Sequence, residues 1–587
     1  MFNFRKRVLL PFLAAGMLVF LGACGSGSAN TSGGSGTETS HTSEEGEAEK
    51  MLTLVKDGTA YVTVVAEDST GGAIADAIET VTGVRPPIAA PKAAPADGIR
   101  LFVRNASGTD AAGLPDGGAY FGYRFTLANG DCYLTAYNDR ILDEAVTALT
   151  ERLSSYYQNG ALTVSSSDSF AVPVAECRRD AGTVPVLVGS RCEGLYDCSD
   201  RLYQVICRNV TADGFSAWCD GLAAAGYTEV SRTNRADNDF RTYTASDGAV
   251  LYASRIGHSS EARLFTSRTY TLPPTDGESQ AICTPLVKQL DASGTNQNEG
   301  MGYIFRLSDG RFIIVDGGYK SNAAAKEIYD FLKANAPDPA HIRIATWFIS
   351  HYHGDHIGAL IRFAENYADD SSITVESFMA NQCLTNSMIG YCNTENGAIL
   401  THTTTLRTYY PNAVFYKPLA GQQYVFADAK IDILYTICDF MPETIPNEPD
   451  TTPTAQKKGD YNTETMVAIF TVEETTFFFM GDTVKTACDE MCARYGETLK
   501  CDYVQISHHG IGKTNPNIYE PRRENSTEEI YRLIAPDYAF LPCSSAKRDE
   551  RMAFTVNRYL KSFLTKYWCA GDEGGDVTLE IPMAGKR

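Results

Sequence analysis

Four polar side chains follow a long apolar run near the middle of the chain. Residues 342–349 are mostly apolar, and the next positions bring three histidines and one aspartate together within six residues: His351, His353, Asp355 and His356. The apolar run predicts a buried strand. A strand cannot hold four neighbouring polar side chains inside an apolar core. We therefore expect all four on the loop at the C-terminal end of the strand, where they point toward a common ligand.

Imidazole and carboxylate groups together favour borderline divalent metals such as zinc, manganese and iron. The alternative interpretation is a polar loop with coincidental histidines. The chain has only 9 histidines among 587 residues, so a chance cluster of three within six positions would be rare. Because the cluster also follows a predicted strand, which is the context such a motif requires, we interpret it as a metal site.

Two further strand ends carry residues of the same kind. Residues 465–480 predict an apolar hairpin, and Asp482 follows its second strand. Residues 503–506 predict another buried strand, which ends at the pair His508 and His509. An acidic residue after a strand also suits the N-cap of a following helix, so Asp482 has two possible roles at this stage.

A second hairpin ends in an aspartate. Residues 303–307 and 311–315 predict two strands joined by a Ser-Asp-Gly turn, and Asp316 follows the second strand. Two glycines come directly after Asp316, so its simplest interpretation is a turn residue.

The spacing His-x-His-x-Asp-His resembles the signature of the metallo-β-lactamase superfamily. The resemblance covers about residues 302–581 and is strongest to one branch, which contains the hydrolase domain of competence-type DNA-uptake proteins and the teichoic-acid phosphorylcholine esterases. The marks of that branch here are Asp355-His356-Ile357-Gly358, Asn462-Thr463-Glu464-Thr465, Gly481-Asp482 and His508-His509-Gly510. It implies an α/β fold, the metallo-β-lactamase αβ/βα sandwich, in the C-terminal part of the chain.

The resemblance also implies two divalent metals, with Zn²⁺ expected and Mn²⁺ or Fe compatible. The ligands it implies are His351 and His353 for the first metal, Asp355 and His356 for the second, and Asp482 as the bridge between them.

The resemblance implies that one histidine of the pair His508 and His509 completes the second metal site. We favour His508 as the ligand and His509 as a contact to substrate phosphate. Asp316 matches the aspartate that orients a ligand histidine without touching the metal. Many family members add a third histidine to the first metal, and the only histidine in the corresponding interval is His402, in a threonine-rich stretch unlike the family. The first site is then weaker or completed by water, and one-metal occupancy stays open.

The implied chemistry is hydrolysis by a metal-activated water, with Asp355 or His509 assisting proton transfer. We expect a phosphodiester or related phosphoester as substrate, either a small molecule or a cell-envelope component. Lactam, lactone or other carbonyl-ester hydrolysis is the second enzymatic alternative. A non-catalytic lipoprotein that binds envelope glycans is the third. A glycosidase is disfavoured because no pair of carboxylates stands in a suitable context.

The N-terminus predicts export. Arg5, Lys6 and Arg7 precede an apolar stretch at residues 8–21, which is too short for a mature membrane span. The sequence Leu-Gly-Ala-Cys that follows resembles a bacterial lipobox, with Cys24 as the lipid-bearing residue and the membrane as its partner. An ordinary signal peptide cleaved after Ala23 is the alternative. We therefore expect a protein anchored by lipid to the bacterial membrane, outside the cytoplasm.

Composition limits the partners. The net charge is −21, which disfavours broad contact with nucleic acid. The 16 cysteines are scattered, and we interpret most as small buried hydrophobic residues. The expected organisation is a signal peptide at 1–23, a Ser/Gly/Glu-rich tether at 24–50, an α/β module at 51–182, an α+β module at 183–277 and the hydrolase domain at 278–587.

Overall fold

The computed structural model describes residues 51–66, 69–105, 122–136, 139–173, 187, 191–199, 202–277, 279–291, 298–381, 398–436, 462, 465–511, 526–571 and 577–582. The expected signal peptide, Cys24 and the tether lie outside these residues. None of the helices within them is both long and apolar enough to cross a membrane.

Two eight-stranded sheets form the C-terminal part of the chain. The first sheet has the order β17 (Thr275–Asp276), β25 (Gln423–Phe426), β26 (Ala429–Tyr435), β27 (Val467–Val472), β28 (Thr475–Phe479), β29 (Tyr503–Gln505), β30 (Tyr538–Ser544) and β31 (Lys566–Ala570). The second has the order β24 (Val414–Tyr416), β23 (Ser377–Ala380), β21 (Ile342–Ile349), β20 (Phe312–Asp316), β19 (Gly302–Arg306), β18 (Leu286–Gln289) and β32 (Val577–Glu580), with β22 (Ile373–Val375) beside β21.

The inner faces of the two sheets meet in an aromatic core. Phe305 of β19 contacts Phe470 of β27 and Phe479 of β28, with ring centroids 5.8 and 5.9 Å apart. Tyr303, also on β19, lies 5.1 Å from Phe479. Because alternate residues of a strand point to opposite faces, the intervening residue Ile304 belongs to the core on the other side of the sheet.

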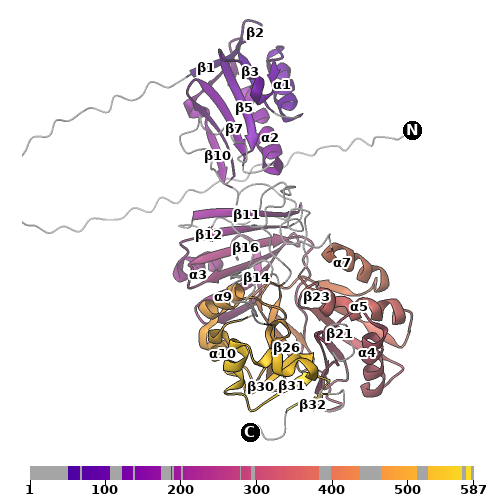
Figure 1. Ribbon diagram of the computed structural model, residues 1–587. Helices are drawn as coiled ribbons and strands as arrows, with labels where there is room; N and C mark the ends of the chain where they lie inside the picture. The colour runs from indigo at the N-terminus through magenta and orange to yellow at the C-terminus, as the bar shows by residue number, and fades with distance from the viewer. Residues whose placement is uncertain are drawn as a thin grey trace, which may run out of the picture. The chain divides into compact units, whose positions relative to one another are not determined.

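Helices cover both outer faces. On the second sheet these are α4 (Asn322–Asn335), α5 (Gly354–Tyr367) and α7 (Ala398–Tyr409), and on the first they include α9 (Lys485–Tyr495) and α10 (Glu528–Ile534), as Figure 1 shows. Two short helices, α11 (Arg548–Met552) and α12 (Thr555–Lys561), lie near the C-terminus. The order of layers is helices, sheet, sheet, helices, so the expected αβ/βα sandwich is confirmed.

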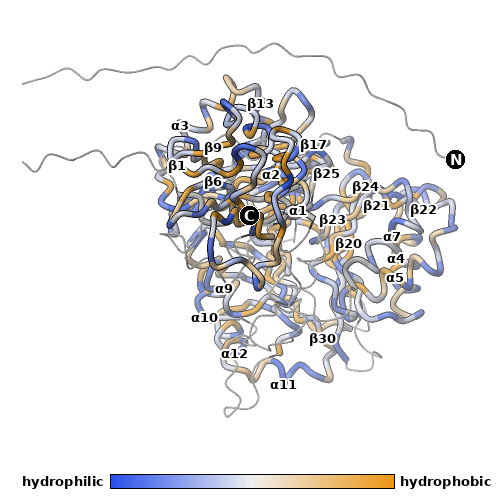
Figure 2. The backbone as a smooth tube through the Cα atoms, turned by 90° about the horizontal axis from the view of Figure 1, so that it is seen from above, coloured by the Kyte–Doolittle hydropathy of each residue, from blue (hydrophilic) through white to orange (hydrophobic). Residues whose placement is uncertain are grey.

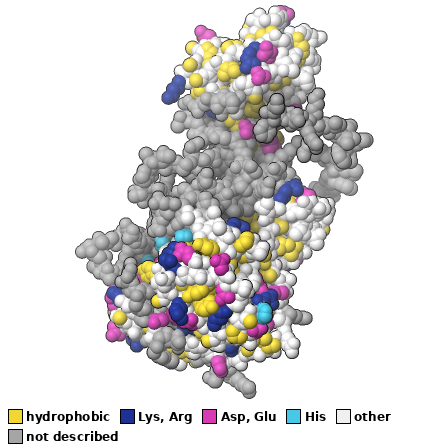
Figure 3. Space-filling model, turned by 90° about the vertical axis from the view of Figure 1, so that its right-hand side faces the viewer, with side chains coloured by type: hydrophobic (Ala, Val, Ile, Leu, Met, Phe, Trp, Pro, Cys, Tyr) yellow, Lys and Arg dark blue, Asp and Glu magenta, His cyan; other side chains and the backbone are white. Residues whose placement is uncertain are grey.

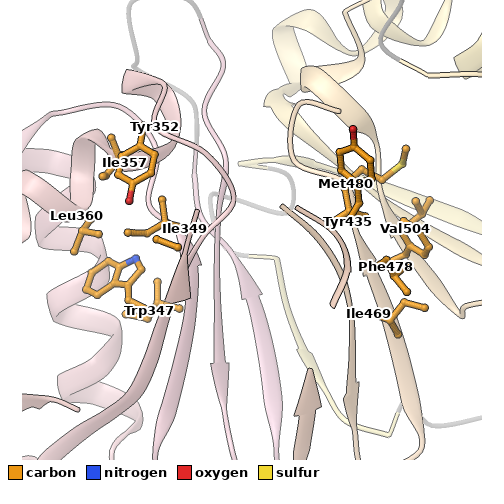
Figure 4. Close-up of a cluster of buried hydrophobic side chains, with 14 of the residues drawn as sticks. Trp347, Ile349, Tyr352, Ile357, Leu360, Tyr435, Ile469, Phe478, Met480 and Val504 are labelled. Atoms are coloured by element: carbon orange, nitrogen blue, oxygen red, sulfur yellow. The ribbon is translucent and has the colours of Figure 1, made fainter. Parts of the chain in front are cut away.

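The outer cores are apolar. Trp347 and Ile349 of β21 pack with Leu360 of α5, while Ile469 and Phe478 form the corresponding group on the other sheet, as Figure 4 shows. Strands β20 and β23 are coloured as hydrophobic in Figure 2. Each is buried along its whole length, as expected for strands that are covered on both faces.

The first module contains two sheets. One has the order β2 (Thr59–Ala60), β1 (Met51–Lys56), β9 (Ala161–Ser165) and β8 (Tyr157–Gln158). The other has the order β10 (Phe170–Pro173), β6 (Gly122–Ala128), β7 (Asp131–Ala136), β5 (Ile99–Asn105), β3 (Val62–Val65) and β4 (Ile88–Ala89). Helices α1 (Ser69–Thr82) and α2 (Asp139–Tyr156) pack against each other here.

The second module is one antiparallel sheet with a helix. Its order is β11 (Arg191–Ser199), β12 (Leu202–Arg208), β16 (Glu261–Ser267), β15 (Val250–Ile256), β14 (Asn238–Ala245) and β13 (Tyr227–Arg235), with α3 (Ala212–Gly221). The sequence did not indicate β11 or β13. Strand β13 is largely exposed at the edge of the sheet, so it has no apolar alternation that would identify it.

Candidate metal centre

His351 and His353 follow the last residue of β21. The loop begins at Ser350, and His351 is 2% exposed while His353 is half-buried. Nε2 of His351 lies 3.0 Å from Nδ1 of His353. These two histidines occupy the loop, as the sequence predicted.

Asp355 and His356 lie in the first turn of α5 rather than on the loop. The loop assignment was therefore wrong for these two residues. A carboxylate is favoured at the start of a helix because the free N–H groups and the helix dipole are positive there. The apolar residues that follow, including Ile357 and Leu360, are buried on the sheet, so the helix starts as soon as the chain leaves the loop.

Asp316 and Ser350 fix the orientation of two histidine rings. Asp316 is fully buried at the end of β20, and Nδ1 of His356 donates to its Oδ2 at 2.8 Å. Nδ1 of His351 donates to Oγ of Ser350 at 3.0 Å. With Nδ1 engaged in each ring, Nε2 is the nitrogen that the neutral ring can offer to a metal. Asp316 thus occupies the supporting position that the sequence comparison implied.

Asp482 is buried at the turn after β28 and is 1% exposed. It is not a helix cap, because the N-cap of α9 is Val484. The preceding residue must be glycine: a Cβ on Gly481 would stand 2.5 Å from Thr465 and 3.0 Å from Ser350. The close approach of these backbones brings Asp482 next to the β21 loop.

His508 and His509 share an unusual backbone. Both have φ of 51°, in the left-handed region that non-glycine residues rarely adopt. Such conformations cost about 1–3 kcal/mol each and concentrate at functional sites. Nδ1 of His509 donates to the carbonyl oxygen of Pro542 at 2.8 Å, which leaves its Nε2 free.

His509, rather than His508, lies among the second-site residues. Its Nε2 is 2.9 Å from Oδ2 of Asp355 and 3.3 Å from Nε2 of His356. The family resemblance of the sequence had favoured His508 as the ligand of the second site. In the structure, His509 lies at that position. The difference follows from the left-handed backbone, which no sequence pattern signals.

The two oxygens of Asp482 face different groups of side chains. Oδ1 is 3.1 Å from Nε2 of His356 and 3.6 Å from Nε2 of His509. Oδ2 is 3.7 Å from Nε2 of His351. The described residues form two groups whose donor atoms lie within 4.8 Å of one another, and Asp482 belongs to both: Asp355, His356, Asp482 and His509, and His351, His353 and Asp482.

Burial and charge act against each other on the histidines. Burial lowers the pKa of His351 well below its usual value, and His356 adds to this effect. Burial also opposes protonation of His356, but the carboxylates around it, Asp482 first, outweigh burial and raise its pKa. The same balance, with Asp482 and then Asp355 acting against burial, raises the pKa of His509 to about 9.

Burial and neighbouring charges shift the pKa values of the carboxylates in the opposite directions. Burial raises the pKa of Asp482, but His356, His509 and His508 outweigh burial and hold it well below its usual value. For Asp355, burial is likewise outweighed by His356 and His509, and its pKa is lowered. The centre thus holds ionised carboxylates in a buried place, which needs a compensating positive charge.

The donor set fits a pair of borderline divalent cations. Imidazole nitrogens and carboxylate oxygens are the ligands that zinc, manganese and iron share. Oδ1 of Asp482 has no hydrogen-bond partner among the described residues although it is buried. A buried acceptor atom without a hydrogen-bond partner is suited to bind a metal ion.

Sequence reasoning did not identify two residues of the centre. Ser350 precedes the histidine motif and reads as an ordinary polar residue. Tyr319 lies close enough to the carboxylates that burial, followed by Asp355, Glu299 and Asp482, raises the pKa of its phenol. No spacing rule connects Tyr319 with residues far along the chain.

The fold and the centre define an α/β sandwich protein with a two-part candidate metal site at its strand ends. Residues 298–373 match the family model described as the metallo-beta-lactamase superfamily. The chain therefore carries a metallo-β-lactamase superfamily domain. The matched segment includes Asp316 and the whole histidine motif. No curated protein sequence matches the chain.

Solved structures are similar to about half of the chain at low identity. The metallo-beta-lactamase fold protein YhfI from Bacillus subtilis is 12% identical, with 51% of this chain and 100% of that chain covered and a TM-score of 0.32. Zn²⁺-bound PqqB from Methylobacterium extorquens is 8% identical, with coverages of 50% and 100% and a TM-score of 0.32. The diiron β-hydroxylase CmlA from Streptomyces venezuelae is 14% identical, with coverages of 52% and 55% and a TM-score of 0.31.

Proposed function

We propose that this protein is a metal-dependent hydrolase of a phosphodiester or related phosphoester. The observation that carries the proposal is Asp482, whose two oxygens face two separate groups of metal-ligand side chains. A carboxylate shared in this way suits a two-metal centre. His351 and His353 belong to the first site, and Asp355, His356 and His509 belong to the second.

Cations held by these side chains would polarise a phosphoryl or carbonyl group and lower the pKa of a water molecule. The protein's own contribution is orientation. Asp316 and Ser350 hold the Nε2 atoms of His356 and His351 toward the centre, and Pro542 does the same for His509. Such fixed ligands avoid reorganisation during the reaction.

Asp355 is the residue of the centre best placed to receive a proton. Its side chain is 18% exposed, whereas those of Asp482 and His509 are 2% and 1% exposed. Its Oδ2 lies 2.9 Å from Nε2 of His509, so a proton can pass between this carboxylate and the neighbouring imidazole. We assign Asp355 both ligand and proton-transfer roles.

The surface supports a small or envelope-derived substrate rather than nucleic acid. The net charge is −21, and phosphate backbones are bound chiefly through basic surfaces. On the face that Figure 3 shows, basic and acidic side chains are interspersed. Positive charge for a phosphoester would come from the metal centre itself.

The test combines metal content with activity. Wild-type protein starting after Cys24 is loaded with Zn²⁺ or Mn²⁺, and its metal content and hydrolysis of bis-(p-nitrophenyl) phosphate are measured alongside Asp482→Ala. The matched control is Asp330→Ala, which removes an exposed carboxylate paired with Lys326 on α4. We expect about two metals per wild-type chain and activity that only Asp482→Ala abolishes.

Other outcomes point to other functions. Metal binding without phosphodiester turnover, combined with cleavage of a lactam or lactone, would replace the proposal with carbonyl-ester hydrolysis. Absence of metal from the wild type would overturn the catalytic proposal and favour an envelope-binding lipoprotein.

We further propose that the protein is exported and anchored to the membrane by lipid on Cys24. The support is the basic start, the apolar stretch and the Leu-Gly-Ala-Cys sequence. Metabolic labelling with an alkyne fatty acid should mark the wild type in the membrane fraction and leave Cys24→Ala unlabelled. The control is Cys283→Ala, which changes a cysteine far from the lipobox. Equal labelling of wild type and Cys24→Ala would contradict the anchor.

A further inference from the structure

The two parts of the metal centre are unequal. Among the residues that the structure describes, four side chains that can bind a metal gather around the second site, and three, His351, His353 and Asp482, gather around the first. Zinc sites are usually four-coordinate. The donors that complete the first site are therefore of interest, since the chain has no third histidine in the place where related proteins carry one.

His508 approaches the first site through the bridging carboxylate. Its Nε2 is 3.7 Å from Oδ2 of Asp482, the same oxygen that Nε2 of His351 approaches at 3.7 Å. Its neighbour His509 faces the other oxygen, Oδ1, at 3.6 Å. The adjacent imidazoles thus lie beside different oxygens of one carboxylate.

The His508 ring is not held by the protein as its neighbour is. Its Nδ1 is buried and has no hydrogen-bond partner among the described residues, whereas His509 is fixed by Pro542. The His508 side chain is also 23% exposed, against 1% for His509. Among the described residues this ring has one hydrogen bond, between its Nε2 and the amide of Asn462, and no group fixes its Nδ1, so the ring can adjust its position to a bound ion.

Asn462 provides a second, independent indication of a ligand. The residue is 8% exposed, and its Oδ1 is buried without a hydrogen-bond partner among the residues described. Its amide lies 3.4 Å from Nε2 of His508. The oxygen and nitrogen of an amide are assigned from their contacts, so this amide can equally present its oxygen toward the first site.

The separation of these two groups matches that of ligands around one ion. Donor atoms about 2.0–2.1 Å from a tetrahedral zinc ion stand about 3.4 Å apart. The amide of Asn462 and Nε2 of His508 are 3.4 Å apart, and the rings of His351 and His353 approach to 3.0 Å. Both contacts are close to ligand–ligand spacing, but the nitrogens of His508 lie outside the group of donor atoms, all within 4.8 Å of one another, that His351, His353 and Asp482 form. The His508 ring therefore has to move toward these residues to share an ion with them.

We propose that His508 and Asn462 complete the first metal site, with the imidazole Nε2 and the amide oxygen joining His351, His353 and Asp482. The His508–His509 pair then serves both metals, one histidine for each. The inference rests on the proposed function, because it requires the two-metal centre. It adds a site composition in which a neighbouring histidine and an amide take the place of the third histidine.

The test measures metal binding directly. Metal-free wild type, His508→Ala, His509→Ala and Asn462→Ala are titrated with Zn²⁺ alone, and stoichiometry is read by calorimetry and by mass spectrometry after dialysis. His341→Ala is the matched control, because His341 is exposed and pairs only with Asp338 among its described neighbours. Circular dichroism verifies that each variant is folded.

We expect His508→Ala to weaken one Zn²⁺ site by about tenfold or more, since even supporting residues change metal affinity by 10–100-fold, and to leave the other site unchanged. Asn462→Ala should weaken the same site, and Asn462→Asp should restore it by returning an oxygen donor. Cobalt-loaded His508→Ala and His509→Ala should lose different components of the visible absorption spectrum.

Two zinc ions bound with wild-type affinity by both His508→Ala and Asn462→Ala would overturn the inference. If Asp482→Ala, titrated with Zn²⁺ in the same way, still loses metal, the proposed function stands while this assignment fails. A wild type that binds no zinc would overturn both.

Discussion

Ser350 donates two hydrogen bonds to the carboxylate of Asp316, one from its backbone N–H and one from its hydroxyl, each 2.7 Å long. Asp316 in turn accepts from Nδ1 of His356, and the Ser350 hydroxyl accepts from Nδ1 of His351. This buried pair therefore connects one histidine from each half of the metal centre. Asp316 is the last residue of β20, and Ser350 directly follows the neighbouring strand β21.

We predict that Ser350→Ala weakens metal binding by about 10–100-fold without unfolding the protein, because it frees the His351 ring from its only fixed partner at Nδ1. The measurement is Zn²⁺ titration of the metal-free protein. Ser377→Ala is the control: its hydroxyl is also buried and donates to the carbonyl of Ala345 at 2.7 Å, but it lies away from the histidines. An equal loss of affinity in both variants would refute a specific role for Ser350.

We predict that Gly481→Ala destabilises the fold and reduces metal binding. Its Cβ would collide with Thr465 and crowd Ser350, so Asp482 must shift. Gly496→Ala is the control, because Gly496 has a similar φ of 51° but nothing within 4 Å of its Cβ position. The collision should make Gly481→Ala less stable than Gly496→Ala by about 1–3 kcal/mol in urea denaturation. Equal stabilities would contradict the close packing of this turn.

The aromatic core should dominate the stability of the sandwich. Phe305 is fully buried and contacts three phenylalanines of the opposite sheet: Phe470, Phe477 and Phe479. Phe305→Ala should lower the free energy of unfolding by about 3–5 kcal/mol. Phe563→Ala, at a residue that is 38% exposed, should change it by less than about 0.5 kcal/mol. If Phe305→Ala lowered the free energy of unfolding by no more than an ordinary surface substitution does, the two sheets would not meet at Phe305.

Removal of metal should destabilise the wild type. A ligand at 100 times its Kd stabilises the folded state by about 2.7 kcal/mol, and here it also neutralises buried carboxylates. A chelator should therefore lower the melting temperature, and added Zn²⁺ should restore it. Asp482→Ala should show neither change. A wild-type melting temperature that does not respond to chelator or zinc would argue against a buried metal centre.

The sequence predicted the strands that carry the centre well, because each is a short apolar run that ends in a polar cluster. Strand β21 has the predicted bounds, 342–349. The sandwich was implied by a resemblance rather than by these runs alone. Strand β13 is polar apart from Tyr227 and Val230, and Val230 is 47% exposed, so no apolar alternation marked this edge strand and it was missed.

The details of the centre depend on contacts that a sequence does not display. His508 and His509 are adjacent and chemically identical, and only their left-handed backbone and the carbonyl of Pro542 place His509 in the second site. Asn462 was noted as part of a motif, but its approach to His508 depends on two segments folding together. The ligand assignments themselves remain predictions.

The most direct test of the account is anomalous diffraction from crystals of the zinc-loaded protein, recorded at the zinc absorption edge. We predict two peaks about 3.5–4 Å apart, one beside each oxygen of Asp482, with His509 at one and His508 at the other. A single peak, or peaks away from Asp482, would contradict the shared carboxylate on which the proposed function depends.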